Sequence, residues 1–293
     1  MWTAWSLDPS LIYVIPAGLL YWLGGRRQSH THVEPWRPVA FAAGLATVVL
    51  ALDSPIDIYA DQLFWVHMIQ HILLLTVAPP LILLGRPWPR MWRALPLRLR
   101  ITTGRSLARA RWTAPLRYLA RPLPAWILFN GTIVAWHIPA AYNLTLTDQA
   151  VHNCEHAMFF FTGLLFWAHV VNPGPLRPRL GWAVRVGYVI GAMLVGWVLA
   201  IVLVLVPHPL YGHYAALAHR PGGISALTDQ QLAAGMMWVP GSISYTVAAF
   251  LAFWRWLEPG RPQSEPVRPR PDLPEPPLSP DRPQPAPPAV IPT

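Results

Sequence analysis

Two short motifs in apolar stretches each carry a pair of histidines four residues apart. HMIQH holds His67 and His71, and HNCEH holds His152 and His156. Because an α-helix has about 3.6 residues per turn, each pair lies on one face of a helix, close enough to share a metal ion. Two imidazoles one turn apart are costly to bury unless they face a cavity, a metal or each other. We therefore expect a metal or cofactor to bind here if the two faces meet.

The composition indicates a membrane protein. The chain of 293 residues is 54% hydrophobic, has a mean hydropathy of +0.34 and is only 12% charged, against about 25% in a typical soluble domain. Because about 20 apolar residues cross a hydrocarbon core, we expect an all-α, polytopic membrane protein with about seven transmembrane helices. The candidate segments are residues 10–23, 37–52, 62–84, 123–139, 150–171, 183–206 and 231–257. No cleavable signal sequence is evident, since the N-terminus lacks a basic region and a small-residue cleavage site.

The arginines indicate the orientation in the membrane. All 22 Lys and Arg positions are Arg, and ten of them lie in one loop, residues 85–122. The positive-inside rule places that loop in the cytoplasm, so we expect the N-terminus outside and the C-terminus inside. The net charge of +9 then belongs to the cytoplasmic face. Topology and the anionic head groups of the lipid bilayer explain this charge with fewer assumptions than a nucleic-acid partner would.

The chain divides into two regions by composition. Residues 1–258 are expected to form one transmembrane helical bundle. Residues 259–293 hold 14 of the 35 prolines and almost no large apolar residues. Such a segment cannot bury enough surface to offset its ordering entropy. We predict that it is an extended, disordered cytoplasmic tail.

The predicted topology brings the histidines to one depth. The third segment runs inward from residue 62, so its two histidines lie about 7–14 Å below the outer surface at about 1.5 Å per residue. His137 ends the fourth segment at that same side, and the second pair opens the fifth segment. The predicted metal ligands are therefore His67, His71, His137, His152 and His156.

Further polar and sulfur-bearing side chains lie near the same outer face. We consider five of them as auxiliary ligands, namely Met68, Met236, Met237, His208 and His213. Three acidic residues are candidates for supporting or capping roles, namely Asp61, Glu155 and Asp229. The simpler alternative is packing for the methionines and helix N-capping for the aspartates.

The ligand types favour copper. Imidazole and thioether groups that face an oxidising compartment, without a cysteine cluster, suit copper and especially Cu(I), although zinc stays open. Cys154 is the only cysteine. It lies about 160–200° around the helix from both flanking histidines, and we expect it to be a packing residue.

Other chemistry is compatible with parts of the pattern. HNCEH fits the H-x-x-E-H motif of inverted zinc proteases, in which Glu155 would be the general base, but nothing else here supports proteolysis. Membrane di-iron hydroxylases and desaturases carry their histidine boxes on the cytoplasmic side, opposite to the topology expected here. A copper transporter would have polar or methionine residues reaching the inner half, which this sequence lacks. A haem held by histidines from two helices, in a haem-binding or redox membrane enzyme, stays open.

Three separated segments resemble one family. They are HMIQHILLLTVAPPLILLGRP from His67, WHIPAAYN leading to VHNCEH, and DQQLAAGMMWVPG from Asp229. They look like the signature segments of the CtaG-like integral-membrane assembly factors of caa-type cytochrome c oxidase, and the resemblance covers residues 10–258. Cys154 is not part of the family pattern.

The resemblance implies a function as well as a fold. It implies a multi-pass protein of the bacterial plasma membrane that takes part in oxidase maturation and is not an enzyme. The usual proposal for this family is delivery of copper to the catalytic subunit. The implied partner is that subunit or an assembly intermediate of the oxidase.

Overall fold

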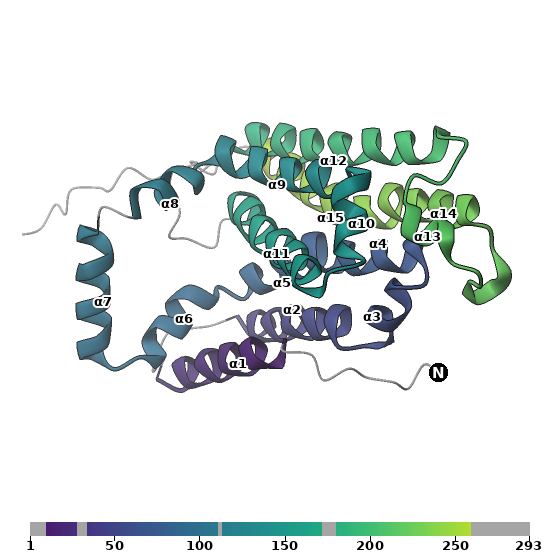
Figure 1. Cartoon of the computed structure of the whole chain (residues 1–293). Coiled ribbons are helices and arrows are strands. Elements are labelled where there is room, and N and C mark those ends of the chain that lie inside the picture. The colour runs from purple at the N-terminus through teal and green to yellow at the C-terminus, as the bar shows by residue number, and fades with distance from the viewer. Residues whose placement is uncertain (1–9, 28–33, 111–112, 172–179, 259–293) are drawn as a thin grey trace, which may run out of the picture. The chain divides into compact units, whose positions relative to one another are not determined.

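The computed structural model describes residues 10–27, 34–110, 113–171 and 180–258, which are helical and contain no β-strand (Figure 1). The first eight α-helices are α1 (Leu11–Arg26), α2 (Trp36–Leu52), α3 (Pro55–Ala60), α4 (Phe64–Ile72), α5 (Ala78–Leu84), α6 (Pro87–Ala94), α7 (Leu97–Arg109) and α8 (Thr113–Leu119). The others are α9 (Pro122–Trp136), α10 (Pro139–Thr145), α11 (Gln149–Val171), α12 (Trp182–Leu205), α13 (Gly212–Ala216), α14 (Ala226–Trp238) and α15 (Ile243–Leu257). A π-helical turn, η1 (Leu73–Val77), joins α4 to α5, and short 3₁₀ turns are η2 (Pro221–Gly223) and η3 (Pro240–Ser242).

Four helical segments are long and apolar enough to cross a membrane. They are Phe64–Leu84, Gln149–Val171, Trp182–Leu205 and Ala226–Leu257. The apolar helices α1 and α2 are shorter, with 16 and 17 residues, and α9 has 15. All seven segments expected from the sequence overlap these helices, with ends that differ by up to five residues. The number of crossings stays a prediction, as does the disorder of the tail, which lies outside the described residues.

The helical segment that carries the first histidine pair changes from an α-helix to a π-helical turn shortly after His71. Pro79 has no backbone N–H, so it leaves the carbonyl of Leu75 without its usual helical partner. Trp167 of α11 fills this gap, since its indole Nε1–H donates to the Leu75 oxygen at 3.0 Å. Leu75 belongs to the π-helical turn η1, and such turns occur frequently at functional sites.

Helix α11 approaches η1 and the start of α5 closely because it presents Gly163 to them. A Cβ atom at Gly163 would lie 2.9 Å from the backbone oxygen of Leu75 and 3.0 Å from Cγ of Pro79. Real Cβ contacts are almost never that short, so a larger residue would push the two helices apart. His152 and His156 share the buried face of α11 with Gly163. The close packing at the glycine therefore also directs these histidines toward α4.

An aromatic core holds α11 against the helices behind it. Phe129 of α9 stacks on Phe166 of α11 with ring centroids 4.2 Å apart. Val189 of α12 and Tyr245 of α15 belong to the same buried cluster. The cluster fixes α11 from the side opposite to α1 and α2, which pack mainly on α5 and α6.

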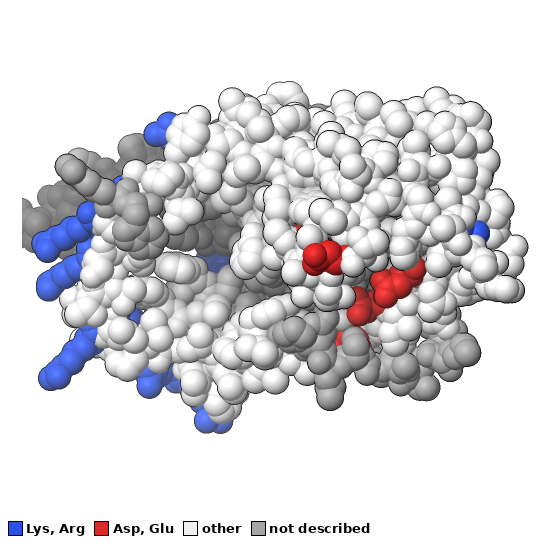
Figure 2. Space-filling model, viewed as in Figure 1, with Lys and Arg blue, Asp and Glu red and all other residues white. Residues whose placement is uncertain are grey.

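Charged side chains separate to different parts of the surface. Figure 2 shows arginines gathered over the region that α6 to α8 occupy in Figure 1, while acidic residues lie near α3 and the start of α11. The arginine-rich segment expected as a loop forms three helices, and α7 alone carries Arg98, Arg100, Arg105 and Arg109. The orientation in the membrane that was inferred from the arginines stays a prediction, and Arg111, Arg177 and Arg179 lie outside the described residues.

Candidate metal centre

Helix α4 is fixed at its N-terminus by an aspartate from a distant helix. Asp229 of α14 is fully buried. Its Oδ2 accepts a hydrogen bond from the backbone N–H of Phe64 at 2.9 Å, and its Oδ1 accepts one from Trp65 at 3.0 Å. A carboxylate at this position satisfies two free amides and complements the helix dipole. Asp229 therefore caps α4 rather than its own helix, which Ser225 caps.

The two histidine pairs face each other across the contact between α4 and α11. The ring centroids of His67 and His71 are 4.3 Å apart, and those of His152 and His156 are 4.1 Å apart. Between the helices, the His67 ring lies 5.1 Å from that of His152, and the His71 ring lies 5.6 Å from that of His156. The two faces that the spacing predicts are thus brought together.

Glu155 lies at the centre of this group. Its side chain lies on the same face of α11 as those of His152 and His156, which are themselves one turn apart. The Oε2 atom lies 3.7 Å from Nε2 of His71 and 4.0 Å from Nε2 of His67. Ligand atoms of His67, His152, Glu155 and His156 all lie within 4.8 Å of one another. A single cation could therefore contact three imidazoles and one carboxylate, with His71 beside them.

The orientation of the His67 ring is set by Tyr214 of α13. The Tyr214 hydroxyl donates to the backbone oxygen of Ala60 at 2.5 Å and lies 3.0 Å from Nδ1 of His67. Burial raises the pKa of Tyr214 well above its usual value, so the hydroxyl keeps its proton. Because that proton goes to Ala60, Nδ1 of His67 must be the donor in the second contact. The lone pair of His67 is then on Nε2, which faces Glu155, and metal-binding histidines are commonly oriented in this way.

Several polar atoms in this group are buried without a hydrogen-bond partner among the described residues. They are Nε2 of His67, both ring nitrogens of His71, Nε2 of His137, Nε2 of His152, Nε2 of His156 and both carboxyl oxygens of Glu155. All six side chains are at most 7% exposed. Buried polar atoms are nearly always paired, and unpaired ones in a group indicate a bound ion or water. Lone pairs and a carboxylate that converge on one point fit a transition-metal cation.

His137 lies beside this group and borders a small cavity. Its Nδ1 lies 2.8 Å from the backbone oxygen of Ile133, and since a carbonyl can only accept, Nε2 carries the lone pair. A cavity of about 60 Å³ is lined by His137, His71, Met68 and Met237, among others. Two thioethers and two imidazoles thus border a space large enough for an ion and a water molecule, which occupies about 30 Å³ in the liquid.

The remaining candidates are not among the four residues whose ligand atoms lie within 4.8 Å of one another. His208 is exposed, and Met236 is partly buried and packs in the neighbouring aromatic cluster. His213 is partly buried, and its backbone N–H donates to Oδ1 of Asn143 at 3.1 Å. Asp61 is exposed at the C-terminal end of α3, so it does not begin a helix.

Cys154 is also exposed, so its side chain does not pack inside the bundle as expected. The spacing placed it correctly on the opposite side of α11 from the histidines, but that side faces outward.

Two features of the site were not predicted from the sequence. Glu155 was assigned a supporting role, although the E in HNCEH shares the face of the two histidines. Tyr214 gave no signal, because its contact with His67 joins residues 147 positions apart.

Comparison with known proteins identifies the family of this chain. The profile of the cytochrome c oxidase caa3 assembly factor family, Caa3_CtaG, matches residues 19–258. Uncharacterized proteins of Mycobacterium bovis and Mycobacterium tuberculosis are 25% identical over 248 residues, which is 80% of this chain and 37% of each relative. An uncharacterized protein of Mycobacterium leprae is 25% identical over 228 residues, 74% of this chain and 34% of its own length.

The chain thus spans little more than a third of the length of these curated relatives. No solved structure matches it. The family match covers both histidine motifs and the segment around Asp229, which confirms the resemblance found in the sequence. The chain belongs to the cytochrome c oxidase caa3 assembly factor family.

Proposed function

We propose that this protein binds copper as cargo and assists its insertion into the copper centre of a caa3-type cytochrome c oxidase. The observation that carries the proposal is the convergence of His67, His152, Glu155 and His156 within 4.8 Å in a buried site. The family assigns a role in oxidase assembly, and this group of side chains gives that role a chemical basis. The protein would act as a metallochaperone rather than as an enzyme.

The small cavity next to His137 supports a proposal in which one set of ligands holds the copper and a second set binds it during release. The carboxylate and three imidazoles would hold the ion most tightly. His71 borders both the Glu155 carboxylate and the small cavity. The soft thioethers of Met68 and Met237 would then bind Cu(I) as it leaves the central group, and His137 would be a further ligand in the cavity. A mixed set of imidazole and thioether ligands favours copper over magnesium or calcium.

The central group of His67, His152, Glu155 and His156 discriminates less between copper and zinc than the thioether-lined cavity does. Three imidazoles and a carboxylate also suit zinc and Cu(II). Copper is favoured here because thioethers adjoin the group and because the family serves an oxidase. A haem is less well supported, since the Glu155 carboxylate lies against both imidazoles of α4, where a porphyrin bridging to α11 would have to fit.

We further propose seven membrane crossings with the metal group near the outer face of the bacterial plasma membrane. The arginines on α6 to α8 and the acidic residues near α3 and α11 support this orientation. Two exposed threonines, Thr147 and Thr102, offer a direct test in a Cys154→Ala background. Thr147→Cys should react with a membrane-impermeant maleimide in intact cells, whereas Thr102→Cys should react only after lysis. The reverse pattern would overturn the orientation.

The assembly role can be tested by the copper content of the client. Cells that lack the protein would be complemented with the wild type, with Glu155→Gln, or with His208→Ala as a control for an exposed histidine outside the group. The oxidase is then purified, and its copper content and activity are measured. Glu155→Gln should lower both, while His208→Ala should restore both. A Glu155→Gln strain whose oxidase holds its full copper would contradict copper delivery and favour a scaffold.

A further inference from the structure

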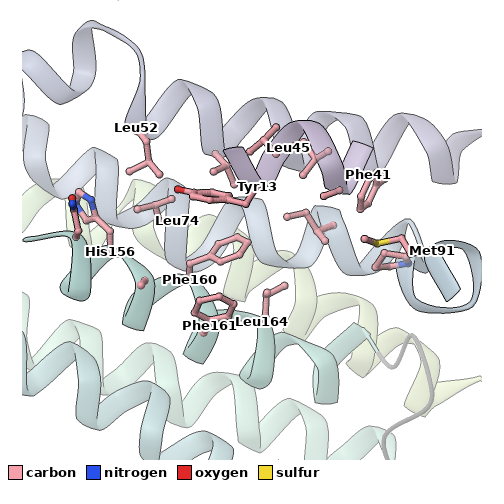
Figure 3. A pocket seen from close by; sticks show the side chains of 17 residues that line it. Tyr13, Phe41, Leu45, Leu52, Leu74, Met91, His156, Phe160, Phe161 and Leu164 are labelled. Atoms are coloured by element: carbon pink, nitrogen blue, oxygen red, sulfur yellow. The ribbon is translucent and has the colours of Figure 1, made fainter. Parts of the chain in front are cut away.

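A second cavity lies on the other side of α11, separate from the small cavity described above. It has a volume of about 620 Å³ and lies between α1 and α2 on one wall and α11 on the other (Figure 3). Leu74 of η1 and Ile82 of α5 line it between the two walls. The cavity exists because α1 and α2 pack mainly on α5 and α6 rather than on α11. Its volume falls within the range of about 300–1,000 Å³ that small-molecule sites occupy.

The cavity is elongated along the helices. Its lining runs from Phe41 to Leu52 on α2 and from Asn153 to Leu164 on α11. Each of these intervals is 11 residues, or about 16 Å at a rise of about 1.5 Å per residue. A slot of this length that follows membrane-type helices suits a hydrocarbon chain better than a compact ring system.

The polar groups of the cavity gather at one end. Of the residues that line it, only Tyr13, Asn153 and His156 are polar, and none carries a guanidinium or ammonium group. Figure 3 shows His156 at one end and Met91 near the other, with the Tyr13 hydroxyl directed toward the His156 end. A phosphate head group would favour a cation at that end. The lining instead suits a head group that is polar and uncharged.

His156 belongs to both the cavity and the metal group. It is 7% exposed, and its Nε2 supplies one of the lone pairs of the metal group, so its N–H is on Nδ1. A histidine that binds a metal through one nitrogen usually donates its other N–H to an acceptor. His67 and His137 have such acceptors in Tyr214 and the Ile133 oxygen. Within the described part of the chain no hydrogen bond of this kind is present for His156, which faces the cavity.

We propose that this cavity binds a membrane lipid with an uncharged head group, of the isoprenoid quinone or diacylglycerol class. The chain lies along the slot, and an oxygen of the head group accepts a hydrogen bond from His156, with Asn153 beside it. An occupied slot then supplies the acceptor that orients the His156 ring. This link to metal affinity rests on the proposed copper function, whereas the lipid site itself does not.

The test compares two substitutions to Phe on α11, one at a position that lines the cavity and one at a position that does not. Ala157 and Cys154 are both exposed, but only Ala157 lines the cavity. Ala157→Phe would fill the slot next to His156, while Cys154→Phe would not. The full chain is purified from its membranes in detergent, and the bound lipids are extracted and quantified by mass spectrometry against the bulk membrane lipids. Size-exclusion elution and circular dichroism check that both variants are folded.

Wild type and Cys154→Phe should retain a stoichiometric neutral lipid, and Ala157→Phe should reduce it to background. The mass identifies the lipid as a quinone or a glycerolipid. If Ala157→Phe does not fold, Ala17→Phe on the opposite wall replaces it. Retention of phospholipid in place of a neutral lipid, absence of any enriched lipid, or equal retention in both variants would overturn the proposal.

Copper affinity is measured on the same samples. Ala157→Phe should bind copper about 10- to 100-fold more weakly than Cys154→Phe, as when a metal-binding histidine loses its supporting acceptor. Neutral lipid retained by a protein that binds no copper would refute the copper function and leave the lipid site standing. Copper bound by a protein that retains no neutral lipid would refute the lipid site alone.

Discussion

Replacement of Tyr214 by Phe is the sharpest perturbation of the metal group, because it removes one oxygen atom and leaves the ligands intact. The hydroxyl lies 3.0 Å from Nδ1 of His67 and holds the lone pair of that ring toward Glu155. Loss of such an orienting partner typically weakens metal binding about 10- to 100-fold. That range corresponds to about 1.4–2.8 kcal/mol at about 1.4 kcal/mol per tenfold change. The Ala60 carbonyl also loses its donor, which costs about 1–3 kcal/mol of folding stability.

Tyr211→Phe is the matched control for this substitution. Tyr211 is 1% exposed, and its hydroxyl donates to the backbone oxygen of His137 at 3.1 Å. Its removal also leaves a buried carbonyl without a donor, but no ring of the central group loses a partner. Cu(I) affinity is measured by competition with a chromogenic chelator on both purified variants. We expect weaker binding in Tyr214→Phe and nearly wild-type binding in Tyr211→Phe, and equal affinities in the two would refute this account of His67.

Three further sets of substitutions test other parts of the structure. Met68→Leu combined with Met237→Leu should lower the affinity for Cu(I) but not for Cu(II), because a thioether is a soft ligand; an equal loss for both ions in the competition assay would remove the methionines from the site. Gly163→Ala should lower the melting temperature in detergent, since its Cβ would meet the Leu75 oxygen at 2.9 Å. Gly187→Ala on α12 has open space and should add up to about 1 kcal/mol of stability, so the two must shift the melting temperature in opposite directions. Asp229→Ala should cost about 0.5–2 kcal/mol of stability through loss of the α4 cap, with partial recovery in Asp229→Asn; thermal unfolding that matches the wild type would contradict the capping role.

The helical segments and the facing histidine pairs could be predicted because both follow from local spacing. An i, i+4 pair lies on one face of any helix, and a run of apolar residues predicts a membrane-type helix wherever it packs. Because the two pairs were predicted at the same depth, we expected His67, His71, His152 and His156 to face one another. The sequence therefore carried most of the information about which histidines converge.

The parts that were missed depend on contacts between distant segments. The cap that Asp229 provides joins α14 to α4, and the Tyr214 contact joins α13 to α4. Neither has a spacing that a single sequence reveals. Cys154 was expected to pack inside, but whether the far side of α11 is covered depends on the helices around it. The cavity beside His156 could not be predicted either, because it depends on how α1 and α2 pack against α5 and α6.

Metal content and absorption of the purified full chain test the central claim most directly. Elemental analysis and a visible spectrum would be recorded on the same detergent-purified sample, before and after addition of Cu(I), for the wild type and for His67→Ala combined with His71→Ala. The account predicts stoichiometric copper and no Soret band in the wild type, and loss of that copper in a double variant that still inserts into the membrane. Copper retained by the double variant, or iron with a Soret band in the wild type, would contradict it.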